Sequence, residues 1–415
     1  MSQIKKTVLP NGIKVLTETL PESKSFSLGF WFEVGSRDED SYHCGITHFI
    51  EHMFFKGTKK RSAKQIVTEI ESCGGYLNAF TSKEHTCYYG RGLVEHFDTT
   101  FDVISDMIQN SVFKQSEIKK EAGVIVDELR DVEDNPEDLI FDKFEEILFA
   151  GNSLSHSILG TEKNIRKFNH DDFVNYISEK YAYDKMLIVS SGGIKHETVM
   201  KLAEKYFNSK LKTSRLNRKY FKNGKSKSGS SYVDKEIQQV HAIIGTSTYG
   251  FDSEQRVHAS LLSQILGEGG SSRLFQSIRE KNGIAYQIHS FLNSFFDTSV
   301  FGIYFSTNEK MIGKALKLVD KELAKLRSSK ISEKELNKAK EALKGTIILS
   351  MESTSNRMIR LAQSELYYGK FKTLDETIKE INSVRVKDIS AAADEILNPK
   401  SLYKLFVKPS KLSIS

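Results

Sequence analysis

The sequence has no apolar run near the ~18 residues that a membrane-spanning helix needs, so no transmembrane span is expected. Its first residues, MSQIKKTVLPNGIKV, have no apolar segment after the lysines, which argues against a secretory signal. They also lack the Arg/Ser-rich character of an organelle transit peptide. We therefore expect a cytoplasmic location, with a mature form that has lost a transit peptide as the alternative.

Cysteine is scarce. The 415 residues include three, Cys44, Cys73 and Cys87, and none forms a CxxC pair. An odd number leaves one thiol unmatched in any set of disulfides, which favours a reducing compartment. Hydrophobic residues make up 39% and charged residues 27%, a composition typical of a globular protein rather than a disordered one.

The formal net charge of +6 comes from one local segment. Residues 210–227 hold eight Lys or Arg and no acid, so the rest of the chain is slightly acidic. A basic run without a recognition module is more typical of a solvated linker than of a nucleic-acid site. We interpret residues 210–231 as an interdomain linker and expect no nucleic-acid partner.

The sequences on either side of this linker resemble each other. Both halves contain a strand-like run, a helical run ending I-[ER]-x-x-x-G, and aromatic strand-like runs further on. Gly75 and Gly283 end these helical runs, and we expect both to adopt the left-handed C′ conformation. The pattern predicts an α+β fold with two similar domains, 1–209 and 232–415, although a coincidental likeness between two α+β segments is the alternative.

The segment GITHFIEHMFF carries the chemistry. His48 and His52 are four residues apart and would project from one helical face, the spacing that presents two imidazoles to one zinc ion. Glu51 shares this face, and the HxxEH order is the inverzincin signature. The alternative is a pair of core histidines bonded to backbone carbonyls, which would leave three polar groups crowded on one face.

A catalytic zinc takes three protein ligands and keeps one position open. The best source of the third is SEIKKEAGVIVDELRDVEDNPED, where Glu121 and Glu128 stand seven residues, or two helical turns, apart. Spacing alone leaves open an ordinary amphipathic helix whose acids face water.

These segments, together with GGYLNAFTSKEHTCYY and LLSQILGEGGSSRLFQSIREKNGIAYQI, resemble the insulinase/pitrilysin family over essentially the whole chain. The likeness is to its short members, the β-subunit of mitochondrial processing peptidase and its bacterial relatives. It implies a zinc endopeptidase whose two domains each pack a mixed, mostly antiparallel sheet with helices and form half of a clamshell chamber. It also implies peptide substrates and a homodimer. The alternatives are a presequence-processing peptidase paired with a related α-like chain, placed in the mitochondrial matrix, or a non-catalytic structural relative.

The resemblance assigns roles residue by residue, with one Zn²⁺ per chain. The implied metal ligands are His48, His52 and Glu128; the implied catalytic residues are Glu51 and Glu121; and the implied substrate contacts are Asn78, Arg279 and Tyr286. In long family members the Arg/Tyr pair comes from the half opposite the zinc, so a dimer is expected to use it in trans.

The chain also departs from the family pattern. The glycine-rich loop of the α-subunit is absent, because LGEGGSSRLF has the short form. His85 and Cys87 receive no role. Cys44 is interpreted as a small core residue rather than a ligand.

Overall fold

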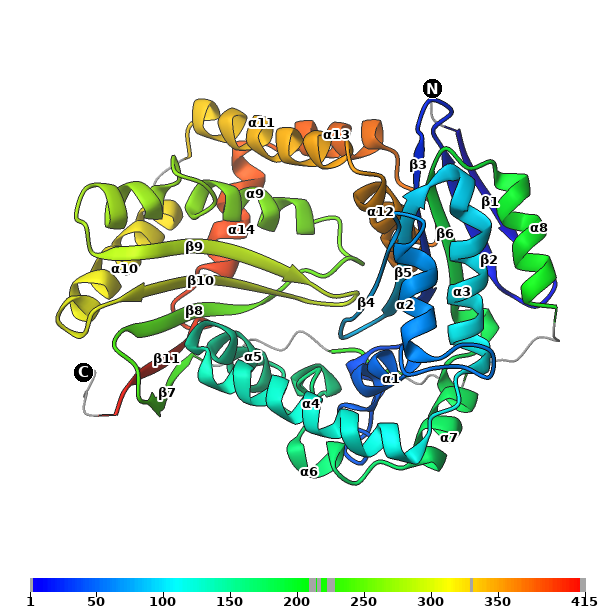
Figure 1. The fold of residues 1–415 in the computed structure, drawn as a ribbon. Coiled ribbons are helices and arrows are strands. Elements are labelled where there is room, and N and C mark those ends of the chain that lie inside the picture. The colour runs from blue at the N-terminus through cyan, green and yellow to red at the C-terminus, as the bar shows by residue number, and fades with distance from the viewer. Residues whose placement is uncertain (1–2, 209–213, 215–217, 222–227, 329–330, 411–415) are drawn as a thin grey trace. The chain divides into compact units, whose positions relative to one another are not determined.

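The computed structural model describes residues 3–208, 214, 218–221, 228–328 and 331–410, so most of the predicted linker at 210–231 lies outside the described residues. The chain forms two compact units (Figure 1). The first unit contains 1–130, 156–219 and 350–371, and the second unit contains 131–155, 220–349 and 372–415.

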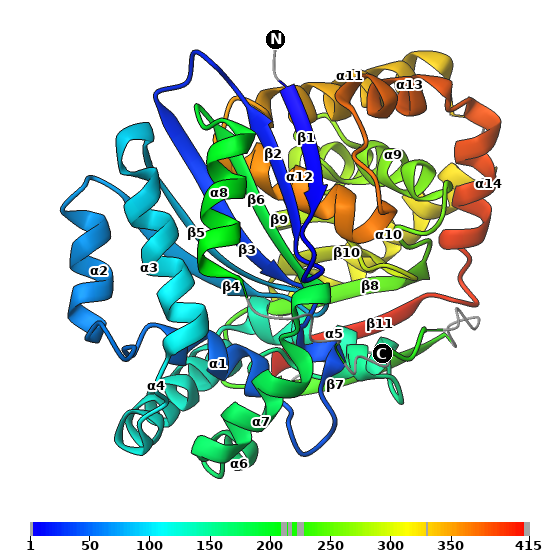
Figure 2. The ribbon, with the colours of Figure 1, turned by 90° about the vertical axis from the view of Figure 1, so that its right-hand side faces the viewer.

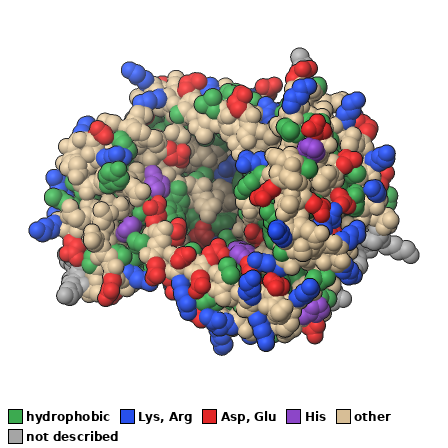
Figure 3. Space-filling view, viewed as in Figure 1, with side chains coloured by type: hydrophobic (Ala, Val, Ile, Leu, Met, Phe, Trp, Pro, Cys, Tyr) green, Lys and Arg blue, Asp and Glu red, His purple; other side chains and the backbone are tan. Residues whose placement is uncertain are grey.

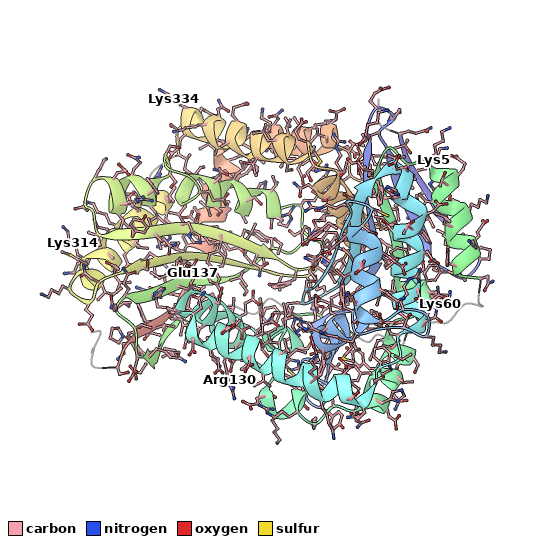
Figure 4. The ribbon with its side chains drawn as sticks, in the orientation of Figure 1. Lys5, Lys60, Arg130, Glu137, Lys314 and Lys334 are labelled. Atoms are coloured by element: carbon pink, nitrogen blue, oxygen red, sulfur yellow. The ribbon has the colours of Figure 1, made fainter. Side chains whose placement is uncertain are left out.

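A six-stranded sheet organises the first unit. Its strands are β1 (Gln3–Val8), β2 (Lys14–Thr19), β3 (Ser25–Phe32), β4 (Tyr76–Thr81), β5 (Thr86–Leu93) and β6 (Met186–Gly192). The order is β1-β2-β6-β3-β5-β4, and only the β2/β6 pair is parallel within this sheet. Helix α8 (His196–Tyr206) runs along β1 and β2 (Figure 2). Lys5 on β1, labelled in Figure 4, donates to Glu197 of this helix over 2.7 Å.

Both faces of this sheet are buried, which explains why β3 reads as the nearly continuous apolar run SFSLGFWF. One face packs against α1 (Ile46–Phe54), α2 (Ala63–Glu71) and α3 (Phe97–Asn110). On the other face, Trp31 and Leu187 pack against Met358 of α12 (Thr354–Tyr368). The remaining helices of this unit are α4 (Gln115–Asp134, ending in the second unit), α6 (Glu162–Ile165) and α7 (His170–Lys180).

The second unit repeats this plan with five strands. They are β7 (Gly229–Lys235), β8 (Val240–Thr248), β9 (Ala285–Ser294), β10 (Ser299–Thr307) and β11 (Tyr403–Pro409). The order is β7-β11-β8-β10-β9, with β7/β11 as the parallel pair. Its helices are α5 (Pro136–Leu148), α9 (Arg256–Leu266), α10 (Ile312–Ser328), α11 (Glu333–Ser350), α13 (Leu374–Ser383) and α14 (Val386–Ile396), with a π-helical turn at Phe275–Glu280. The predicted α+β class with mixed, mostly antiparallel sheets is confirmed.

Short 3₁₀ turns complete the described elements. They are η1 (Ser36–Asp38), η2 (Val94–His96), η3 (Ser153–Ser155), η4 (Tyr183–Lys185) and η6 (Glu309–Met311).

The compact units do not follow the continuous division expected at 1–209 and 232–415. Helix α5, from the earlier half of the chain, buries Ile140 and Phe144 against the sheet of the second unit. Helix α12, from the later half, covers one face of the first unit's sheet. Each sheet therefore has an apolar face that its own half of the sequence does not cover.

The expectation for the two glycines is half right. Gly283 has φ +60°, as expected, and its N–H donates to the carbonyl of Arg279. In the first half the left-handed residue is Gly74, with φ +64°, rather than Gly75. Position 75 needs glycine for a steric reason instead, because a Cβ there would lie only 2.9 Å from Cγ2 of Ile70.

The described part of the chain contains no helix with both the length and the hydropathy needed to cross a bilayer. Acidic and basic side chains are interspersed on the face shown in Figure 3.

Candidate metal centre

Helix α1 forms where the HxxEH segment predicted a helix. Its apolar residues Phe49 and Ile50 are fully buried in the core of the first unit. His48 is 7% exposed, and Glu51 and His52 are partly buried, so all three polar side chains are largely shielded from solvent. Their placement on an otherwise apolar helix requires polar partners.

Glu128 reaches the two imidazoles from α4. Its Oε1 lies 3.8 Å from Nε2 of His48, and its Oε2 lies 3.6 Å from Nε2 of His52. The imidazole centroids are 4.6 Å apart. One ligand atom from each of the three side chains lies within 4.8 Å of the others, and this is the only such group of histidine, cysteine or carboxylate ligands in the described part of the chain. The arrangement can hold a metal ion.

Glu121 lies on the same helix as Glu128 but contacts a different atom. Its Oε1 is 2.9 Å from Nδ1 of His52, and its Oε2 accepts from Nζ of Lys56 over 2.7 Å. Burial acts to raise the pKa of Glu121, but the hydrogen bonds from His52 and Lys56 outweigh it and hold the pKa below its usual value. Glu121 is only 3% exposed, so it does not face water as the amphipathic-helix alternative requires.

Burial lowers the pKa of His48 to about 3, and the neighbouring His52 acts in the same direction. His48 is therefore a neutral imidazole at physiological pH, the form that binds metal. Its Nδ1 is buried and has no hydrogen-bond partner among the described residues. The two histidines thus differ, because only His52 has a side chain that fixes its ring.

Glu51 is held by a neighbouring strand. Oγ1 of Thr81, the last residue of β4, donates to Oε2 of Glu51 over 2.5 Å. Burial raises the pKa of Glu51, as does the charge of Glu128, whereas Thr81 and His52 act to lower it. The raised pKa moves this carboxyl toward the range that suits a general base.

Asn78 also lies on β4, the edge strand of the first unit's sheet. It is three residues from Thr81, so the two side chains point to opposite faces of the sheet. Its Nδ2 donates to the Tyr76 hydroxyl over 2.7 Å rather than to the histidine group.

Arg279 and Tyr286 lie together in the second unit. The Arg279 guanidinium is 5.2 Å from the centroid of the Tyr286 ring, and Tyr286 is 76% exposed at the start of β9. The structure therefore brings this predicted pair side by side.

Sequence reasoning missed two side chains at this centre. Lys56 stands four residues after His52, the spacing of neighbours on one helical face, although α1 itself ends at Phe54. Thr81 lies within GGYLNAFTS, but no local pattern linked it to Glu51. Cys44 is buried and is not a member of the group that could hold a metal ion.

Comparison with known proteins identifies the family. The family profile described as Insulinase (Peptidase family M16) matches residues 14–162, and the one described as Peptidase M16 inactive domain matches residues 167–343. The chain is 37% identical over 396 residues to the uncharacterized zinc protease YmxG of Bacillus subtilis, an alignment that covers 95% of each protein. The chain belongs to the insulinase family of peptidases, family M16. Another relative of this M16 protein, an uncharacterized zinc protease of Rickettsia bellii, is 35% identical over 406 residues, covering 98% of this chain and 97% of the other.

Solved structures share the fold of this M16 chain. A protease from Helicobacter pylori superimposes with a TM-score of 0.91 at 24% identity, covering 98% of this chain and 100% of the other. A protein of Pseudomonas fluorescens described as a peptidase M16 inactive domain gives the same TM-score at 20% identity, covering 100% and 98%. At these identities the likeness supports the fold alone.

Proposed function

We propose that this chain is a zinc-dependent endopeptidase that hydrolyses short, extended peptides and holds one zinc ion per chain. The observation that carries the proposal is the convergence of His48, His52 and Glu128, with Glu51 on the same helix as both histidines. Membership of family M16 and the names of its relatives support the same activity.

The residues present fit zinc. Two imidazole nitrogens and one carboxylate oxygen form a ligand set that catalytic zinc sites use, with a further position left open. The neutral state of His48 suits it to binding, and Glu121 orients His52 through the ring nitrogen that would not face the ion. Bound zinc would polarise the scissile carbonyl and lower the pKa of water.

Glu51 is the proposed general base. It would accept a proton from the attacking water at a carboxylate oxygen and then deliver that proton to the leaving nitrogen. The hydrogen bond from Thr81 fixes one of its oxygens, so the carboxylate is oriented before substrate binds.

The proposed substrate site is the free edge of β4. This strand pairs with β5 on one side and ends the order of the sheet, so a peptide could add to it as a further strand. Because Thr81 of β4 touches Glu51, a peptide bond paired near the end of the strand would lie close to the base. Backbone pairing selects extended chains more than particular sequences, which favours short unstructured peptides.

Glu51→Gln tests the proposal. The amide has nearly the volume of the carboxyl and can still accept from Thr81, so the protein should fold and bind zinc. Turnover of a peptide library, followed by mass spectrometry, should fall by about 10²–10⁴-fold. A chelator should abolish cleavage by the wild type, and added zinc should restore it. Glu71→Gln, an exposed acid at the end of α2, is the matched control and should cleave normally. Undiminished cleavage by Glu51→Gln would remove this residue from the reaction.

We further propose a homodimer in which Arg279 and Tyr286 of one protomer act at its partner's metal centre. Their mutual contact and the exposure of Tyr286 suit them to donate hydrogen bonds to a substrate carbonyl. Size-exclusion chromatography of the purified chain distinguishes a homodimer from a chain that needs a related partner.

Mixing two inactive variants tests the trans arrangement. One carries Arg279→Ala with Tyr286→Phe, and the other carries Glu51→Gln. In trans, each mixed dimer has one intact site, so random exchange at equal concentrations should restore roughly a quarter of the wild-type site content. An inactive mixture despite measured subunit exchange would contradict the arrangement.

A further inference from the structure

The helix that carries the histidines is capped by a residue from outside it. Glu39 lies in the turn before α1 and is only 4% exposed. Its Oε2 accepts from the Gly45 N–H over 2.7 Å, and its Oε1 accepts from the Thr47 N–H over 2.8 Å. One carboxyl thus satisfies two backbone donors that a helix N-terminus leaves without intrahelical partners.

The local sequence cannot supply this cap. Gly45 occupies the N-cap position with φ +95°, and it has no side chain with which to accept a hydrogen bond. Another residue cannot replace it, because a Cβ there would lie 2.7 Å from the Leu159 carbonyl oxygen. The first turn of α1 also contains no acidic residue. The close approach at Gly45 therefore makes the helix depend on an acceptor outside it, six residues before the N-cap.

The dependence matters most for His48. This residue stands in the first turn of α1, next to Thr47, whose N–H Glu39 accepts. Its Nδ1 has no hydrogen-bond partner among the described residues, whereas His52 is fixed directly by Glu121. The position of the His48 ring is therefore set by packing and by the backbone of the first turn.

We infer that Glu39 is the positioning residue for His48, because it holds the first turn of α1 at the place from which Nε2 faces the metal position. Glu39 acts on His48 through the backbone, as Glu121 acts on His52 through its side chain. The inference rests on the proposed function, in that it takes His48 to be a zinc ligand.

Keeping a carboxyl at this place has a cost that the hydrogen bonds offset only in part. Burial raises the pKa of Glu39 to about 8, and the bonds from Gly45 and Thr47 act in the opposite direction. A residue that served only to stabilise the fold would change stability and leave zinc affinity unaltered, which separates the two roles experimentally.

Zinc affinity of the full chain, measured by competition with a chromogenic chelator, tests the inference without relying on turnover. In Glu39→Gln the amide oxygen can accept one N–H, but the NH₂ group opposes the other. We expect zinc binding to weaken by about 10–100-fold, the usual effect of losing a residue that orients a ligand. Glu39→Asp keeps the carboxyl group but is too short to reach both donors, and it should weaken zinc binding in the same direction.

Asn169→Ala is the matched control. Asn169 caps α7 in the same unit, with Oδ1 accepting from the Asp171 N–H over 2.9 Å. Its removal should lower the melting temperature of the metal-free chain without changing zinc affinity.

The outcomes separate this inference from the proposed function. Wild-type zinc affinity in folded Glu39→Gln and Glu39→Asp would overturn the inference alone. So would a loss of affinity in Asn169→Ala equal to theirs, because the effect would then follow stability. A wild-type chain that binds no zinc would overturn the proposed function and this inference together.

Discussion

Glu121 offers the sharpest test of how the metal centre is built. Its side chain is only 4% exposed, and its carboxylate contacts two groups, Nδ1 of His52 at 2.9 Å and Nζ of Lys56 at 2.7 Å. Glu121→Gln preserves the volume but removes the negative charge. The amide oxygen can still accept from one of the two groups, and its NH₂ then faces the other donor.

The size of the effect follows from these contacts. A carboxylate that accepts from a ligating histidine fixes the ring and raises its basicity, and losing such a group typically weakens metal binding by about 10–100-fold, or ~1.4–2.8 kcal/mol. We expect Glu121→Gln to lie within this range and Glu121→Ala at its upper end. Glu128→Ala should weaken binding further than either, because it removes a proposed ligand atom rather than its support.

Chelator competition at fixed pH gives the zinc affinities directly. Lys56→Met is the matched control, since it removes the second partner of Glu121 and leaves the contact with His52 in place. It should bind zinc more tightly than Glu121→Gln does. Wild-type zinc affinity in Glu121→Gln, or a larger loss in Lys56→Met, would refute the orienting role.

Two further predictions concern pH. Thr81→Val removes a hydrogen bond that lowers the pKa of Glu51, so the acidic limb of kcat/KM should move to higher pH; a pH–rate profile that coincides with the wild type would contradict this. Burial lowers the pKa of His85 to about 3, with Arg218 acting in the same direction. Below pH 6.5 this histidine therefore binds a proton in the unfolded chain but stays neutral in the folded chain. The free energy of unfolding consequently falls as the pH drops from 6.5 toward 3. When the pH is lowered from about 7.5 to about 5, the free energy of unfolding in urea should fall by ~2 kcal/mol less in His85→Phe than in the wild type. Equal losses would refute the lowered pKa of His85.

Much of the metal centre could be predicted from local spacing. His48, Glu51 and His52 fall on one helical face whatever the rest of the fold does, because the period of the helix fixes their directions. Glu128 could not be selected this way, since Glu121 lies on the same helix two turns away. In the structure the two glutamates lie against different ring atoms. Glu128 faces Nε2 of both histidines, and Glu121 faces Nδ1 of His52.

The organisation of the chain shows the same limit. Strand-like and helical runs predicted an α+β fold with two similar halves, because periodicity records which face of each element is buried. Periodicity does not indicate which other segment of the chain covers that face. The α12 residue Met358 packs on Trp31, more than three hundred residues away. Helix α5, which ends at Leu148, packs on a sheet whose strands lie between Gly229 and Pro409.

The sequence by itself therefore determined the fold class, the paired histidines and the acid beside them, since these follow from backbone periods and side-chain chemistry. Tertiary structure decided which carboxylate faces Nε2 of both histidines, which helix covers which sheet, and which residue outside α1 caps it. The first two choices depend on contacts between segments far apart in the chain. The cap depends on a closed turn that brings the Glu39 carboxyl within 2.7 Å of the Gly45 N–H, six residues along the chain, and no residue of α1 itself indicates that contact.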